Sequence, residues 1–198
     1  MIAFPRSLRG TAVLIFFFST VTCAQVMTLQ VRKEDSQIEF SIYKWGVFKE
    51  EGRFRDFDGS IEFDPSDLSA TTVEFAVNTS SVDSRNEGRD RALRSEEFFN
   101  VTKYPTMRFK SVKAEGKGNQ LRIRGDLTIR GVTKRLTIPV TVSGVQHAGG
   151  KLGTLVGFES SFTISRTDFH VADGWSIIDE NATIHLLIGA GTRVTASH

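Results

Sequence analysis

Short runs of alternating hydrophobic and polar residues follow one another along most of the chain. In the run 38–42, Ile38, Phe40 and Ile42 alternate with polar residues. The same two-residue period recurs at 61–63, 73–77, 121–130, 136–142 and 162–164. A period of two with β-branched and aromatic residues is typical of strands that have one apolar and one solvated face. The pattern therefore predicts a domain built almost entirely of β-strands.

Turn signals separate these runs. They are Asp58-Gly59, 64–67, 117–119, Arg130-Gly131 and 148–150. No parallel β-α rhythm occurs, so the strands are expected to be antiparallel, in a sandwich or a closed barrel. The pattern alone does not choose between these two, although about eight strands would close a barrel wide enough for one ligand.

One stretch, DSRNEGRDRALRSEEFFN at 83–100, breaks the rhythm because it is polar, charged and poor in β-branched residues. It predicts a helical insertion of one or two short turns, with Ser95 as N-cap ahead of Glu96 and Glu97. A further strand is expected to resume at 106–112.

The first 24 residues differ from everything that follows. Arg6 and Arg9 precede the unbroken apolar run 12–18, and small and polar residues close the segment. This is the layout of a secretory signal peptide. We therefore expect a cleaved signal peptide at 1–24, a single β-barrel or sandwich domain at 25–198, and a periplasmic or secreted location.

Two other fates stay open for this segment: an uncleaved anchor and, because of Cys23, a lipid-modified N-terminus. An uncleaved anchor is disfavoured because the apolar run is far shorter than the roughly 20 residues needed to cross a bilayer. Lipidation of Cys23 is disfavoured because Thr20 stands where a lipoprotein signal has Leu, and the bulky Thr22 precedes the cysteine. Cys23 is the only cysteine. A mature domain would therefore have no disulfide, no thiolate metal site and no cysteine nucleophile.

Charge and motif content exclude several classes of function. The net charge of the chain is +2, and loss of Arg6 and Arg9 brings it to about zero, without the clustered basic surface of a nucleic-acid-binding protein. No nucleophile motif or glycine-rich phosphate loop is present. Asp168 and His170 share a spacing that suits one strand face, but two ligands are too few for zinc. The sequence therefore predicts neither a catalytic residue nor a metal site.

Four arginines, Arg85, Arg89, Arg91 and Arg94, gather in the helical insertion. Planar arginine donors suit the pyrophosphate or carboxylate head of a ligand. Acidic residues are interleaved with them, which favours a self-neutralising, solvated surface that contributes little to stability. Both interpretations stay open.

The segment RDRALRSEEFFNVTKYPTMRF at 89–109 resembles the signature of the YceI-like family. It carries that family's Arg-Asp, Leu-Arg-Ser, acidic residue, Phe pair and Tyr-Pro in order. Three further stretches also resemble the family: 59–64 its early strand, 125–134 its central hairpin, and 165–169 its late Arg-x-Asp-Phe strand. The matches span most of 36–188.

This resemblance implies an extended, lipocalin-like antiparallel barrel, usually periplasmic or secreted. It also implies an elongated apolar cavity for a polyisoprenoid, an isoprenoid quinone or a long acyl chain. Two positions depart from the family pattern. Asp35 stands before Ser36 where the family commonly has His, and His170 stands where it often has Gly. Either change would bear on the cavity mouth or a head-group contact.

Apolar side chains that face the inside of such a barrel are the candidate lipid-binding residues, because ligand sites are concave and mostly apolar. Most phenylalanines are expected simply to fill the core. Burial of a long hydrocarbon at about 0.8 kcal/mol per CH₂ would supply affinity without any charge. The candidates are Phe40, Ile42, Phe63, Phe75, Val77, Phe109, Leu127, Ile129, Phe162 and Ile164.

The sequence therefore favours binding, storage or transport of a long apolar lipid in the cell envelope over catalysis. No cofactor is required, although an isoprenoid lipid or quinone would be expected to co-purify. One alternative is an enzyme or redox accessory acting on such a lipid, with Arg166, Asp168 and His170 as its first candidates. Another is a stress-related envelope interaction protein without a tight ligand. A dimer and a transient membrane contact both stay open.

Overall fold

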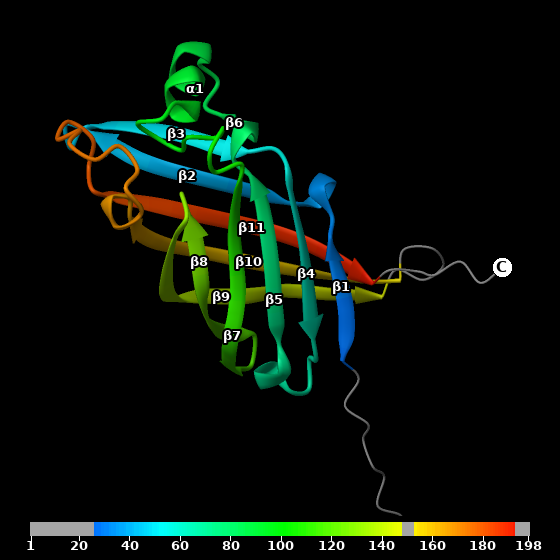
Figure 1. Cartoon of the computed structure of the whole chain (residues 1–198). Helices are drawn as coiled ribbons and strands as arrows, with labels where there is room; N and C mark the ends of the chain where they lie inside the picture. Colours follow the sequence, from blue (N-terminus) through cyan, green and yellow to red (C-terminus); the bar gives the residue numbers. More distant parts are fainter. Residues whose placement is uncertain (1–25, 148–152, 193–198) are drawn as a thin grey trace, which may run out of the picture.

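The computed structural model describes residues 26–147 and 153–192. Within these residues, eight antiparallel strands close into a barrel through the pairing of the first strand with the last (Figure 1). Barrel closure decides between the two predicted architectures. The barrel strands, in sheet order, are β1 (Met27–Val31), β4 (Phe57–Phe63), β5 (Thr72–Asn78), β7 (Thr106–Lys117), β8 (Gln120–Ile129), β9 (Val132–His147), β10 (Thr154–Ser165) and β11 (Asn181–Thr192). The predicted signal peptide at 1–24 and the turn at 148–150 lie outside the described residues.

Three further strands extend the sheet from β11: β2 (Gln37–Lys44), β3 (Phe48–Phe54) and the two-residue β6 (Val82–Asp83). The helix α1 (Glu87–Arg94) follows β6 and lies beside β3 and β6 (Figure 1). Within the described residues, the connections also contain the 3₁₀ turns η1 (Lys33–Asp35), η2 (Leu68–Ala70), η3 (Thr79–Ser81) and η5 (Thr167–Phe169). Among the described helices, none has the length and apolar character needed to cross a membrane.

The insertion contains the predicted helix, but the predicted N-cap is wrong. Asn86 caps α1, since its side-chain oxygen accepts a hydrogen bond from the backbone N–H of Arg89 at 2.9 Å. Ser95 is the C-cap, and its hydroxyl donates to the carbonyl of Ala92 at 2.7 Å. The chain turns after Ser95 because Phe98, which follows it, packs into the buried core instead of continuing a helix.

The predicted turn at Asp58-Gly59 is also wrong, because both residues lie inside β4. Gly59 pairs directly with Phe75 of β5. A Cβ at Gly59 would come within 2.9 Å of the Phe75 ring. The glycine therefore serves the packing of a neighbouring aromatic side chain, a role that the turn signal does not distinguish from chain reversal.

The core fills one end of the barrel completely. Leu29, Phe63, Leu121, Val156 and Ala190 are each at most 1% exposed. They come from five different strands: β1, β4, β8, β10 and β11. They fill the end of the barrel away from α1, because none of them lines the interior cavity that residues of α1 reach.

Candidate functional site

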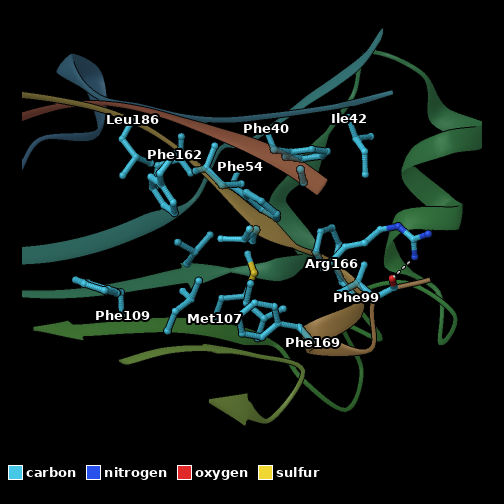
Figure 2. Close-up of a pocket in the computed structure, with 18 of the residues that line it drawn as sticks. Phe40, Ile42, Phe54, Phe99, Met107, Phe109, Phe162, Arg166, Phe169 and Leu186 are labelled. Atoms are coloured by element: carbon cyan, nitrogen blue, oxygen red, sulfur yellow. Dashed lines mark hydrogen bonds between the residues drawn. The ribbon is translucent and has the colours of Figure 1, made fainter. Parts of the chain in front are cut away.

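An apolar cavity of about 550 Å³ occupies the interior of the barrel (Figure 2). This volume lies within the range of roughly 300–1,000 Å³ that is typical of small-molecule sites. Inward-facing strand side chains form most of its wall. Nine of the ten residues that the sequence proposed line it: Phe40, Ile42, Phe75, Val77, Phe109, Leu127, Ile129, Phe162 and Ile164. Their part in lipid binding stays a prediction.

The structure places the tenth candidate, Phe63, outside the cavity. Its side chain is 1% exposed, and its ring packs edge-on against Phe158, with 5.4 Å between the ring centroids. The two-residue alternation, or parity, placed Phe63 on the inward face of its strand. However, parity says nothing of depth along the barrel, and Phe63 belongs to the closed end.

Several lining residues that the sequence proposal omitted come from the helical insertion. Phe99 packs edge-on against two strand aromatics at the mouth, with ring centroids 5.5 Å from Phe54 and 6.5 Å from Phe40. Phe98 and the apolar face of α1 also line the cavity, through Ala92 and Leu93. The sequence does mark two of these residues, since Phe98 and Phe99 are adjacent aromatic residues in an otherwise polar segment.

The segment after β10 supplies further lining residues at the mouth that the sequence proposal omitted. Phe169, Val171, Trp175 and Ile178 all line the cavity there. Trp175 packs edge-on against Phe98, with 5.3 Å between the ring centroids. The insertion and this segment thus meet across the mouth, although they are far apart in sequence. No periodicity marks either segment, because neither is a regular strand.

Arg166 organises this second segment. Its buried guanidinium donates hydrogen bonds of 2.5–2.9 Å to five backbone carbonyl oxygens, and these occupy all five of its N–H groups. The acceptors belong to Val171, Ala172, Trp175, Ile178 and Asp179. Arg166 lies at the cavity (Figure 2), but it has no N–H group left for a ligand.

The structure does not bring Arg166, Asp168 and His170 together as a reactive constellation. Asp168 lies in η5, where it pairs with Lys134 at 3.3 Å, and His170 pairs with Asp173 at 2.8 Å. Both side chains are exposed, and neither lines the cavity. The prediction that Asp168 and His170 share a strand face is wrong, because His170 caps η5 in the left-handed region, at φ 57°. Across 26–147 and 153–192, no cluster of three or more metal-ligating side chains occurs.

The two departures from the family pattern also lie away from the cavity. Asp35 forms an ion pair with Arg32 at 2.9 Å and does not line the cavity wall. His170 occupies a left-handed position that glycine takes most readily. The difference at 170 therefore concerns backbone conformation, not a head-group contact.

The arginine cluster of the insertion divides into separate roles. Arg94 donates to the carbonyls of Ser80 and Val82, at 2.8 and 2.6 Å, and so ties α1 to the strand before it. Arg89 reaches the cavity wall, where it forms an ion pair with Glu50 and donates to the Ser84 carbonyl at 3.0 Å. Arg89 and Glu50 therefore give the mouth a polar edge.

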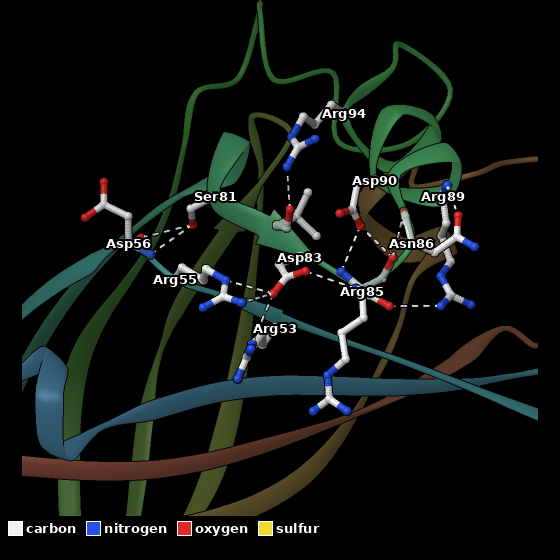
Figure 3. A network of polar contacts seen from close by, with 12 residues as sticks. Arg53, Arg55, Asp56, Ser81, Asp83, Arg85, Asn86, Arg89, Asp90 and Arg94 are labelled. Atoms are coloured by element: carbon white, nitrogen blue, oxygen red, sulfur yellow. Dashed lines mark hydrogen bonds and ion pairs between the residues drawn. The ribbon is translucent and has the colours of Figure 1, made fainter.

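A second polar network fixes β6 against β3 (Figure 3). The carboxylate of Asp83 accepts a hydrogen bond from the backbone N–H of Arg85 at 3.0 Å. It also accepts from Arg55 at 2.7 Å and from Arg53 at 3.2 Å. These donors hold the pKa of Asp83 at about 2, below the ordinary value of an aspartate. Asp83 thus stays ionised and keeps the insertion anchored at the mouth.

A closed antiparallel barrel with one blocked end and one apolar cavity defines a class of ligand-holding barrels. The family model for the YceI-like domain matches residues 29–190. The chain is similar to a UPF0312 protein of Pseudomonas aeruginosa, with 42% identity over 134 residues, which covers 68% of this chain and 70% of the relative. The chain belongs to the YceI-like family.

The fold also occurs in solved structures. BcnA of Burkholderia cenocepacia superimposes with a TM-score of 0.72 at 23% identity, covering 80% of this chain and 98% of that one. A polyisoprenoid binding domain from Saccharophagus degradans superimposes with a TM-score of 0.65 at 14% identity, covering 85% and 99%. At these identities the likeness shows the barrel fold alone.

Proposed function

We propose that this protein binds a long apolar lipid, a polyisoprenoid, an isoprenoid quinone or a long acyl chain, and stores or transports it in the cell envelope. One observation carries the proposal: an apolar cavity of about 550 Å³ that is blocked at one end of the barrel. A tail inserted there is removed from water along its length, at about 0.8 kcal/mol per CH₂. The polyisoprenoid ligand named for the Saccharophagus degradans domain supports the same class of ligand.

The polar edge at the mouth fits the head of such a lipid. Arg89 supplies donors and Glu50 supplies acceptors at the cavity wall. A few polar groups at the end of an apolar site fix the orientation of a ligand more than they add to its affinity. We therefore place the lipid tail in the barrel and its head at the α1 end.

Binding, not catalysis, is the proposed activity. Arg166 is saturated by carbonyls, and the exposed Asp168 and His170 side chains point to partners outside the cavity. The YceI-like family is not known as an enzyme family. The signal-peptide layout of 1–24 supports export to the periplasm or beyond.

Filling the cavity tests the proposal. Ala182 lines it from β11, so an Ala182→Phe variant would place a ring in the bore. We expect a fluorescent long-chain fatty acid to bind this variant about tenfold more weakly or worse, because overfilling a packed site costs roughly 1–3 kcal/mol. Fluorescence titration measures the affinity, and circular dichroism checks the fold.

A matched control is available on the outer face of the barrel. Ala76 alternates with the cavity residues Phe75 and Val77 on β5 and does not line the cavity. Ala76→Phe makes the same chemical change outside, and it is expected to leave the probe affinity unchanged. Equal binding by a folded Ala182→Phe variant and the wild type would refute the proposal.

A further inference from the structure

The tip of the β2–β3 hairpin exposes apolar side chains to solvent. Trp45 is 59% exposed, Val47 72% and Phe48 59%. The rings of Trp45 and Phe48 pack edge to face, with 6.1 Å between centroids, so they form one apolar wedge. Single exposed apolar residues are common, but three within four consecutive positions make a patch that indicates an interaction surface.

The backbone at this tip makes the tryptophan unexpected. Trp45 and Gly46 both have positive φ, 54° and 66°. The turn spans residues 45–47, between the paired Lys44 and Phe48, and its two left-handed positions favour Asn or Gly, since a bulky residue there costs roughly 1–2 kcal/mol. Asparagine would therefore form the turn more easily and expose no indole. The backbone of the turn therefore does not itself require an indole at position 45.

Two lysines, Lys44 and Lys49, flank the wedge on the hairpin itself. The ammonium of Lys44 lies 4.4 Å from the centroid of the Trp45 ring, and Lys49 follows Phe48 directly. The stretch 43–49 contains no acidic residue, although Lys49 pairs with Glu51 further along β3. Tryptophan, aliphatic and lysine side chains together match the headgroup region of a bilayer, where rings meet acyl chains and ammonium groups meet phosphates.

The hairpin tip adjoins the cavity mouth. Its turn is held against the segment after η5, since the Trp45 N–H donates to the Ile177 carbonyl at 2.8 Å. The N–H of Asp179 donates in return to the Tyr43 carbonyl at 2.9 Å. Ile177 and the partly exposed Trp175 line the cavity. Tip and segment lie side by side at one end of the barrel (Figure 1).

We propose that the hairpin tip, formed by Trp45, Val47 and Phe48 with Lys44 and Lys49, docks on a phospholipid bilayer and holds the cavity mouth against it. A lipid with a long apolar tail would then pass between bilayer and barrel without crossing water, where its tail would be exposed. The docking goes beyond the proposed lipid binding, because Trp45, Val47 and Phe48 do not line the cavity that would hold a tail.

Vesicle binding tests the docking directly. The variant Trp45→Asn, Val47→Ser, Phe48→Ser removes the wedge and keeps a turn residue that tolerates positive φ. In sedimentation with vesicles of phosphatidylethanolamine and phosphatidylglycerol, we expect the wild type to pellet and this variant to partition about tenfold less or worse. Val112→Ser is the matched control, since Val112 is 56% exposed on β7, outside the tip. It should pellet as the wild type does.

Affinity for the soluble fatty-acid probe separates the docking from the lipid-binding proposal. The triple variant should keep the probe affinity of the wild type, whereas Ala182→Phe should lose probe binding and still pellet with vesicles. A wild type that pellets without binding the probe would refute lipid carriage alone. A wild type that binds the probe and stays in the supernatant would refute docking alone.

A spectroscopic measurement identifies the residue that enters the bilayer. The chain has two tryptophans, so Trp175→Phe leaves Trp45 as the sole indole. We expect its emission to shift to the blue on vesicles and to be quenched by brominated acyl chains. Unquenched Trp45 in pelleted protein would overturn the proposal. So would a wild-type dimer that the triple variant dissociates without any vesicle binding, because the tip would then be a protein interface.

Discussion

Arg166 determines the shape of the cavity mouth more than any other single side chain. The segment after β10 contains little regular secondary structure, so its backbone carbonyls do not form a strand ladder. The guanidinium gathers five of these carbonyls around one buried cation. Lysine has three donors on a single nitrogen and cannot reproduce this fork. The segment therefore depends on arginine specifically, not on positive charge.

Arg166→Lys is expected to lower the free energy of unfolding by about 2–4 kcal/mol, because at least two carbonyls lose a charged donor in a buried place. Urea unfolding followed by circular dichroism measures the change. Arg122→Lys on β8 is the matched control, and this exposed position should change stability by about 0.5 kcal/mol or less. Similar midpoints for Arg166→Lys and the wild type would show that the carbonyl cluster does not hold the segment.

The sequence identified Arg166 as a residue of interest but suggested the wrong partners. Its acceptors are main-chain carbonyls, which every residue carries and which leave no trace in a sequence. The hydrophobic alternation predicted the cavity wall more successfully, since it placed Phe40 and Phe162 on the inward faces of their strands. It failed for Phe63, because depth in the barrel depends on how the strands are staggered.

Three glycines make room for aromatic rings within the strands. Gly52 lies directly opposite Phe40, and Gly59 lies opposite Phe75. At Gly125 a Cβ would come within 2.4 Å of the Phe109 ring. A ring that covers a cross-strand glycine lies flat against the sheet and does not project into the cavity. Phe40, Phe75 and Phe109 all line the cavity, so these glycines keep the bore wide.

Gly52→Ala is expected to narrow the cavity with little loss of stability. Its Cβ would come within 2.4 Å of the Phe40 ring, whose atoms are its three nearest neighbours and which can swing into the bore. We expect about tenfold weaker binding of the fatty-acid probe and a stability loss of about 1 kcal/mol. The double variant Gly52→Ala, Phe40→Leu should recover the affinity. Persistent weak binding in the double variant would argue against displacement of the ring.

Gly125→Ala provides a contrast within the same barrel. There the Cβ would also lie 2.6 Å from the backbone carbonyl of Lys110, which cannot move aside as a ring can. Its main effect should be on stability, with a loss of about 2–3 kcal/mol in urea unfolding. A milder effect than that of Gly52→Ala would contradict this account of the two sites.

At the level of elements, the sequence predicted the strands that alternate cleanly and missed those that do not. The inward positions of β3 are Glu50, Gly52 and Phe54, which no hydrophobic period marks. In β11 an exposed Leu187 interrupts the alternation. Closure into a barrel followed from the family resemblance, since hydrophobic alternation is the same in a sandwich.

The whole molecule is a barrel with two unlike ends. Bulky side chains such as Phe63 and Leu121 fill one end, and the insertion and the segment organised by Arg166 surround the other. Because one end is filled, a lipid tail would enter the barrel from the other end. It also places the exposed hairpin tip at the same end as the cavity mouth, so one face of the molecule would serve both docking and exchange.

Native mass spectrometry of the protein purified from its own cell envelope tests the central claim most directly. We expect an adduct with the mass of one long apolar lipid, which organic extraction releases and which the Ala182→Phe variant lacks. An isoprenoid chain with or without a quinone head would fit the cavity and its polar edge. Repeated recovery of an empty barrel, with no lipid in the extract, would contradict the account.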